Sequence, residues 1–146
     1  METLRIEVAF MGSNEIKFML NTPSEEIDSS LLRVGFINTV TPNLPDKTIV
    51  VDFGVQYAYK NEPILECRYA FNFAYNDPNN IGIIKPKEDG LQINNDLMAI
   101  ILNVAVGAIR GIMITRTSGT TLSKLPLPIL DLQTLLETVI LLPSKA

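Results

Sequence analysis

Apolar and polar residues alternate along much of the first half of the chain, which is the pattern of strands with one buried face. A glycine-containing stretch at 12–14 interrupts the first alternating run, and prolines lie between the later ones. The pattern predicts four strands, at residues 4–20, 32–41, 48–59 and 65–75.

The third and fourth runs place their large side chains at odd positions. These are Ile49, Val51, Phe53, Val55, Tyr57 and Tyr59 in the third run, and Leu65, Cys67, Tyr69, Phe71, Phe73 and Tyr75 in the fourth. If Tyr59 faces Leu65, a five-residue turn joins the strands and every odd residue lies on one face. We therefore expect an α+β fold, in which a four-stranded antiparallel sheet has one apolar face that another element covers.

A long apolar segment supplies the cover. Asn94 or Asn95 can cap a helix that runs from about Asp96 to about Thr115, roughly 30 Å at 1.5 Å per residue. This helix is apolar on more than one side, and a single sheet buries only one of them. The pattern therefore predicts that a second surface, most simply that of another subunit, covers the other side of the helix. The residues expected at that subunit interface are Leu97, Ile101, Val104, Ala105, Ala108 and Arg110.

The same segment, 97–114, is the only candidate for a membrane span. It contains Asn103, Arg110 and two glycines, and its flanks lack an aromatic belt. Because a charge at the centre of a bilayer is costly, a helix buried within protein is the favoured interpretation. Arg110 is expected within the last turns, where a cation meets the negative helix end, and Gly111 is expected to weaken the helix there.

The chain after this helix is expected to be extended and then helical again. Residues 117–130 contain Pro126 and Pro128, which forbid helix and favour extended backbone. Asp131 is expected to cap a last helix, which Pro143 ends. Its apolar residues follow helical spacing: Leu132, Leu135, Leu136, Val139 and Ile140.

Length and composition fit one domain over residues 1–146. The net charge is −4, and the twelve Lys and Arg residues are scattered, so a nucleic-acid partner is not expected. The start, METLRIEVAF, carries an acid at Glu2 and alternates polar with apolar residues, so it has neither the basic start nor the unbroken apolar core of a secretory signal. With a single cysteine, the chain cannot form an internal disulfide. We therefore expect a cytoplasmic protein.

Residues that could carry catalysis are few. Histidine is absent, and no phosphate-binding glycine loop occurs, so no metal or cofactor site is predicted. Cys67 lies on the apolar face of its strand and is expected in the core. Of the carboxylates, Asp52 and Glu66 are expected on the solvated face and Asp131 at a helix cap. We therefore predict a protein that is not an enzyme, because a carboxylate enzyme would need a polar cleft that the sequence does not indicate.

The apolar residues of the proline-bearing stretch and the last helix exceed what one small core needs. Such surplus apolar surface usually marks a partner site. It is expected to be either a subunit interface or a groove for unfolded chains.

The order of these elements resembles the SecB protein-export chaperone family. The run Glu15-Ile16-Lys17-Phe18 with Pro23 nearby is similar to the family's first strand and following loop. Arg110-Gly111 is similar to the Arg-Gly at the end of its long helix, and Leu130 to Leu136 to the start of its second helix. The resemblance spans nearly the whole chain. It departs from the family pattern at the proline before the last helix, Pro128, which is shifted by one position.

The resemblance implies a homotetramer, a dimer of dimers with the long helices between two sheets. It also implies an ATP-independent holdase that binds non-native polypeptides in apolar grooves formed by the first two strands, the connector and the last helix. The client-binding residues implied are Phe10, Ile16, Phe18, Leu20, Val34, Phe36, Leu125, Leu127, Ile129, Leu132, Leu135, Leu136, Val139 and Ile140.

Two settings for such a protein are open. One is protein export, in which precursor polypeptides are the clients. The other is an interaction module for one dedicated partner such as an antitoxin, because the family includes chaperones that control toxin–antitoxin pairs. Export members often continue into a Cys- and His-bearing tail that binds zinc and docks on the SecA motor. The last residues of this sequence are Pro143-Ser144-Lys145-Ala146, so the resemblance does not extend to zinc-mediated docking on SecA.

Overall fold

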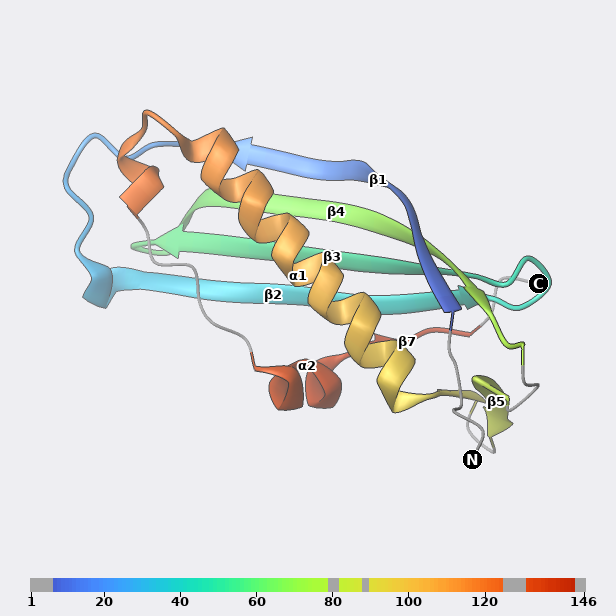
Figure 1. Ribbon diagram of the computed structural model, residues 1–146. Helices are drawn as coiled ribbons and strands as arrows, with labels where there is room; N and C mark the ends of the chain where they lie inside the picture. The colour runs from blue at the N-terminus through green and yellow to red at the C-terminus, as the bar shows by residue number, and fades with distance from the viewer. Residues whose placement is uncertain (1–6, 79–81, 88–89, 125–130, 144–146) are drawn as a thin grey trace.

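A computed structural model describes residues 7–78, 82–87, 90–124 and 131–143 of the chain. It shows a long twisted sheet with one long helix laid diagonally across one face and a short helix beside one edge (Figure 1). The predicted connector residues Leu125, Leu127 and Ile129 lie outside the described residues.

The main sheet has five strands in the order β1-β4-β3-β2-β7. Neighbouring strands are antiparallel, except that β7 runs parallel to β2. The bounds are Glu7–Leu20 for β1, Leu32–Asn43 for β2, Thr48–Tyr59 for β3, Glu62–Asn76 for β4 and Ile140–Leu141 for β7. The prediction of four antiparallel strands is thus corrected by one short parallel strand. Two paired residues carry too little alternation to be seen in a sequence.

The odd positions of β3 and β4 lie on one face, as predicted, and form the core. Tyr57, Phe53 and Phe71 are at most 1% exposed. The register differs from the prediction, because Tyr57 faces Leu65 and a bulge follows Tyr57. A two-residue turn at Lys60 and Asn61 replaces the expected five-residue turn, and both residues have positive φ, 51° and 66°. Positive φ at both positions is the type I′ geometry that suits twisted hairpins.

Strand β1 forms one edge of the sheet and changes face along its length. Its register with β4 shifts between Phe10 and Gly12 and again between Glu15 and Lys17. Each shift adds a residue, so the predicted alternation, with Phe10 and Phe18 on one face, holds only because two bulges cancel. Between the bulges the helix-side face carries Ser13 and Glu15, opposite Phe71 and Tyr69.

The long helix α1 spans Asn95–Thr117 and covers the core face. Asn94 caps it, with its side-chain oxygen accepting from the N–H groups of Asp96 at 2.8 Å and Leu97 at 3.3 Å. The helix continues six residues past Gly111, and the backbone turns at Gly119, where φ is +81°. Arg110-Gly111 therefore does not mark the helix end. A single glycine costs a helix only about 1 kcal/mol, and the packing of α1 on the sheet outweighs that cost.

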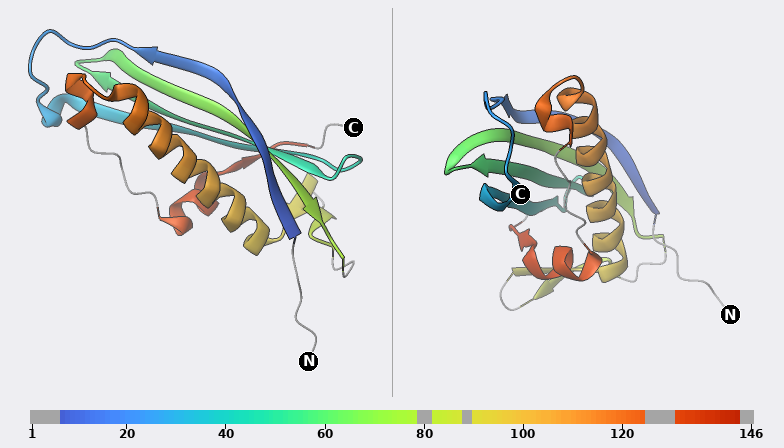
Figure 2. Two further views of the ribbon diagram at one scale, coloured as in Figure 1. Left: turned by 45° about the horizontal axis from the view of Figure 1, so that its top comes forward. Right: turned by 90° about the vertical axis from the view of Figure 1, so that its left-hand side faces the viewer.

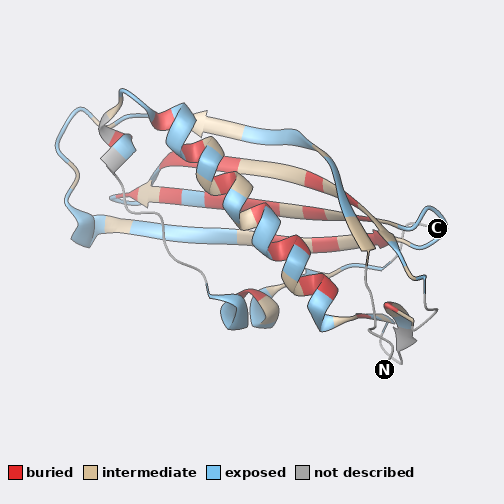
Figure 3. Ribbon diagram, in the orientation of Figure 1, coloured by how far each residue is buried: buried red, intermediate tan, exposed pale blue. Residues whose placement is uncertain are grey.

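The helix α1 is long and apolar enough to cross a membrane, with a mean hydropathy of 2.2 over the relevant window. In this fold it lies against the sheet, and its buried residues recur at helical spacing along one stripe (Figure 3). They are Leu97, Met98, Ile101, Leu102, Ala105, Ile109, Met113 and Thr117.

The remaining elements are short. The 3-10 helices η1 (Ser29–Leu31) and η2 (Thr121–Lys124) precede β2 and follow α1. The hairpin of β5 (Ile84–Lys87) and β6 (Gly90–Ile93) lies before α1. The helix α2 (Leu132–Thr138) runs beside the β2 edge and leads into β7 (Figures 1 and 2). As predicted, Asp131 caps α2, and its Oδ1 accepts from the N–H of Thr134 at 2.7 Å.

Candidate functional site

An exposed apolar surface lies on β2 and the C-terminal elements beside it. Val34 and Phe36 of β2 are 39% and 42% exposed, although they lie on the same face as the core. They stay exposed because α1 crosses the sheet diagonally and leaves this part of β2 uncovered (Figure 3). We use the name β2–α2 surface for the apolar side chains Val34, Phe36, Leu132 and Leu136. Ile140 of β7 is opposite Thr39 and therefore lies on the other face of the sheet.

Helix α2 contributes both to this surface and to the core. Leu132 is 38% exposed and Ile140 of β7 is 60% exposed, whereas Leu135 is 2% exposed. Leu136 and Val139 are half-buried and pack against the core. Leu135 therefore anchors α2 and is not available to a client, which corrects its predicted role in client binding.

Asn38 joins α2 to the sheet and was not singled out by the sequence analysis. It lies on the core face of β2, is 7% exposed, and donates from Nδ2 to the Leu135 carbonyl oxygen at 3.2 Å. Among the described residues, none donates a hydrogen bond to its Oδ1. The signal was present in the sequence, because Asn38 is the polar residue in the otherwise apolar series Leu32, Val34, Phe36, Val40.

The predicted client-binding residues of β1 lie away from the β2–α2 surface, at the other edge of the sheet. Strand β1 and strand β2 lie at opposite sides of β4 and β3, so they do not line one groove. Phe10 is 51% exposed and packs against Phe73 at a ring separation of 5.6 Å, while Ile16 is 45% exposed. Phe18 and Leu20 are half-buried against the core. The resemblance implied that the first two strands line one groove, but the loop between them runs past the β3–β4 turn at the end of the sheet and joins its two sides (Figure 1).

The outer face of α1 is a second exposed apolar surface. Ile100, Val104 and Ile114 are 41%, 40% and 63% exposed. Together with Gly107 and Gly111 they recur at spacings of four, three, four and three residues, which is the spacing of a helix–helix seam. We call these five residues the outer α1 stripe. Beside the stripe, a hollow of about 550 Å³ is bordered by the two glycines, Tyr69 and Arg116.

The predicted subunit interface is corrected by this arrangement. Leu97, Ile101 and Ala105 are 0% exposed because they pack on the chain's own sheet, so they cannot contact another subunit. Val104 is exposed on the outer α1 stripe, and Ala108 and Arg110 are half-buried. The sequence marked the two apolar sides of the helix but could not assign which side faces the sheet.

Arg116 fastens the end of α1 to β1. It forms an ion pair with Glu15, donates to the Tyr69 hydroxyl at 3.2 Å, and lies 3.6 Å from the centre of the Phe18 ring. The hydrogen bond from Arg116, followed by that from Tyr69, lowers the pKa of Glu15. Arg116, and not Arg110 as predicted, is therefore the cation in the last turn of α1.

The carboxylates on the other face of the sheet are paired. Asp52 accepts from Arg68 at 2.8 and 2.6 Å, and Glu66, which is 7% exposed, pairs with Lys17 at 2.8 Å. The expectation that Glu66 is solvated is therefore corrected. The hydrogen bond from Lys17 is the main reason that the pKa of Glu66 is lowered. A carboxylate held ionised beside a cation is poorly suited to accept or donate protons near neutral pH.

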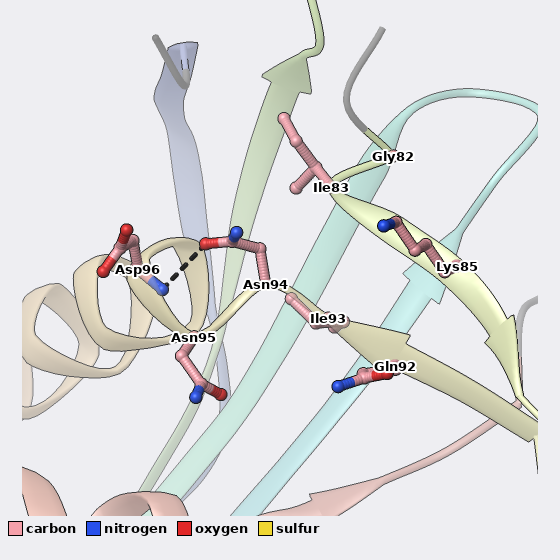
Figure 4. Close-up of a pocket in the computed structure, with 8 residues that line it drawn as sticks. All are labelled: Gly82, Ile83, Lys85, Gln92, Ile93, Asn94, Asn95 and Asp96. Carbon is pink, nitrogen blue, oxygen red and sulfur yellow. Dashed lines mark hydrogen bonds between the residues drawn. The ribbon is translucent and has the colours of Figure 1, made fainter. Parts of the chain in front are cut away.

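A polar hollow of about 320 Å³ lies at the start of α1, between the β5–β6 hairpin and the helix (Figure 4). It is bordered by Lys85, Gln92, Asn95 and Asp96. The Asn94 side chain is engaged in capping the helix and is not available to a ligand. Within the described ranges, no cluster of three or more His, Cys, Asp or Glu side chains could hold a metal ion.

No family model and no curated protein sequence matches the chain. Among solved structures, the chain is similar to the Mycobacterium tuberculosis SecB-like chaperone Rv1957 in complex with a ChAD peptide from the Rv1956 HigA1 antitoxin. The TM-score is 0.53 at 14% identity, over 85% of this chain and 91% of the other. At this identity the similarity concerns the fold, and the chain has a SecB-like α+β fold.

Proposed function

We propose that the protein is a chaperone that binds extended, non-native polypeptide segments on the β2–α2 surface without ATP. The observation that carries this proposal is the exposure of Val34 and Phe36 on the core face of β2, beside the exposed Leu132 of α2. Apolar contact of this kind gains roughly 25 cal/mol per Å² buried and demands little of the client's sequence. The similar structure, a SecB-like chaperone holding an antitoxin peptide, supports a polypeptide as the ligand.

The test is suppression of aggregation of a chemically unfolded client, followed by light scattering without nucleotide. We expect the wild-type protein to suppress scattering, and Phe36→Ser and Val34→Ser to weaken the suppression. Leu44→Ser is the matched control, because Leu44 is 37% exposed but lies in the turn between β2 and β3. If an assembled, folded protein leaves client aggregation unchanged, the proposal fails.

A module for one dedicated partner is the second candidate. It is favoured by the antitoxin peptide bound to the SecB-like chaperone of similar fold. A pull-down from the native host separates the two candidates. One stoichiometric partner argues for the module, whereas many unrelated polypeptides argue for a general holdase. Recovery of export precursors together with SecA would place the holdase in protein export.

The proposal includes a homo-oligomer in the cytoplasm. The outer α1 stripe is the surface through which a second copy would pack, and a tetramer would arise as a dimer of dimers with these helices between two sheets. In a reducing cytoplasm the lone Cys67 would remain a thiol. Its burial raises its pKa to about 11, which keeps it unreactive at neutral pH.

A further inference from the structure

The edge of β2 that faces away from β3 is paired over a very short stretch. Among the described strands, only β7 pairs with it, at Thr39 and Val40, in parallel. The N–H of Leu142 donates to the Val40 carbonyl oxygen at 2.8 Å. From Leu32 to Asn38, no described strand pairs with this edge. An edge of this kind presents backbone donors and acceptors that can pair with another extended chain.

The strand β7 that occupies this edge is lightly held. It has two residues, of which Ile140 is 60% exposed and Leu141 is half-buried against the core. Leu142, which follows the strand, is 40% exposed. Asn38 binds the preceding helix α2 through Nδ2, at 3.2 Å from the Leu135 carbonyl oxygen.

We propose that β7 is a displaceable latch, which occupies the β2 edge in place of an extended client segment. This inference rests on the proposed chaperone function and names how its client binds. The client is an extended segment in which apolar and polar residues alternate. Its backbone pairs with β2, and its alternate side chains contact Val34 and Phe36, which lie two residues apart on one face.

The competition favours a longer strand. The intramolecular strand pairs over Thr39 and Val40 alone, whereas a client along β2 from Leu32 to Val40 gains further backbone hydrogen bonds and covers the exposed Val34 and Phe36. The latch keeps the edge closed to other chains when no client is present, which limits edge-to-edge aggregation.

The test compares two variants at one position. Leu142→Pro removes the N–H that bonds Val40, and Leu142→Ala is the matched control that keeps it. The probe is a fluorescently labelled peptide of alternating Val or Phe and Thr. It is about ten residues long, enough to span Leu32 to Val40 at roughly 3.4 Å per residue. Because one backbone hydrogen bond is lost, we expect Leu142→Pro to bind the peptide about two- to tenfold more tightly than Leu142→Ala. Equal or weaker binding would overturn the latch.

Circular dichroism and oligomeric mass establish that both variants are folded. A peptide methylated at alternate backbone nitrogens is expected to lose affinity, because it cannot donate to the edge. If it binds as tightly as the unmodified peptide, pairing with the β2 edge is excluded.

A second measurement needs no client. By amide hydrogen exchange, we expect the Leu142 amide to exchange at least about a hundredfold faster than those of Val51 and Phe53 in the central strand β3. Equal protection would show that β7 does not open and would overturn the latch. If no variant binds any peptide, the chaperone function fails, and the exchange comparison still decides whether β7 opens.

Discussion

Glu66 shows how a single ion pair shapes the polar face of the sheet. The residue is 7% exposed, and its carboxylate is 2.8 Å from the Lys17 ammonium. A carboxylate this far from water is stable as an ion only with such a partner. The pairing joins the edge strand β1 to β4, so charge complementarity reinforces the backbone pairing of these strands.

Removing Lys17 should destabilise the protein at neutral pH more than in acid. The pKa of Glu66 is lowered from 4.5 in the folded state, so its stabilisation is present above the unfolded pKa and is lost as pH falls through the folded pKa. Lys17→Met should therefore cost about 1–2 kcal/mol at pH 7, and this difference from wild type should shrink as pH falls toward 3, where Glu66 is protonated in both proteins. The measurement is urea unfolding between pH 3 and 7.

The matched control is Lys60→Met, which breaks the pair with Glu25, in which both side chains are about half exposed. Solvent screens that pair, so Lys60→Met should destabilise the protein less than Lys17→Met. Equal effects of the two substitutions would contradict the account of Glu66.

Arg116 is expected to stabilise the protein through its planar shape as well as its charge. Arg116→Ala should lower the unfolding temperature, because it removes the ion pair with Glu15 and the stacking on Phe18. Arg116→Lys keeps the charge but not the flat guanidinium, so its stability should lie between that of wild type and that of Arg116→Ala. Thermal unfolding gives the comparison, and a lysine variant as stable as wild type would show that stacking contributes nothing.

At the scale of elements, the turn between β3 and β4 and the two bulges of β1 decide the register. Lys60 and Asn61 both adopt positive φ, which fixes a tight hairpin in the centre of the sheet. The bulges in β1 reverse the face of its residues twice and bring Glu15 to the helix side, opposite Tyr69. This places a carboxylate where Arg116 of α1 can reach it.

The turn should be sensitive to the residue at position 61. Asn tolerates the left-handed conformation, glycine adopts it freely, and a β-branched side chain does so only with strain. We expect Asn61→Gly to change stability by less than about 1 kcal/mol and Asn61→Val to cost about 1–2 kcal/mol. Denaturant unfolding measures both, and a neutral Asn61→Val would mean that the turn relaxes to another geometry.

At the scale of the whole molecule, the proposals concern two exposed apolar surfaces formed by described residues. The β2–α2 surface lies at the β2 edge, and the outer α1 stripe runs along the exposed side of the helix. The two surfaces can act at the same time, because a client on β2 and a second copy on α1 would not compete for the same residues.

Assembly should depend on the glycines of the outer α1 stripe. Outside the helix backbone, no atom lies within 4 Å of where a Cβ would stand on Gly107 or Gly111. Gly107→Ala should therefore stabilise the isolated chain by up to about 1 kcal/mol. The larger side chain of Gly107→Leu should also fit without a clash in the isolated chain. Both substitutions should nevertheless weaken the close packing of a second helix against α1. Sedimentation measures the mass, with unfolding as the control for fold.

An oligomeric wild type that dissociates on Gly107→Leu while staying folded is the expected result. A wild type that is monomeric at high concentration would contradict assembly through α1. Gly54→Leu serves as the contrasting variant, because its Cβ would stand 3.1 Å from the Arg68 side chain and strain the chain itself.

The sequence alone determined the main strands, the two helices and the buried face of β3 and β4. Alternation of period two and helical spacing are local, so the strands β2 to β4, the core residues of β3 and β4, and the caps Asn94 and Asp131 could be predicted. Only the tertiary structure decided what depends on distant residues: β1 and β2 lie on opposite sides of β4 and β3, Leu97 and Ile101 face the sheet, and β7 joins β2. These outcomes depend on strand order and on the angle at which α1 crosses the sheet. Neither leaves a local pattern, because both arise from packing between residues far apart in the chain.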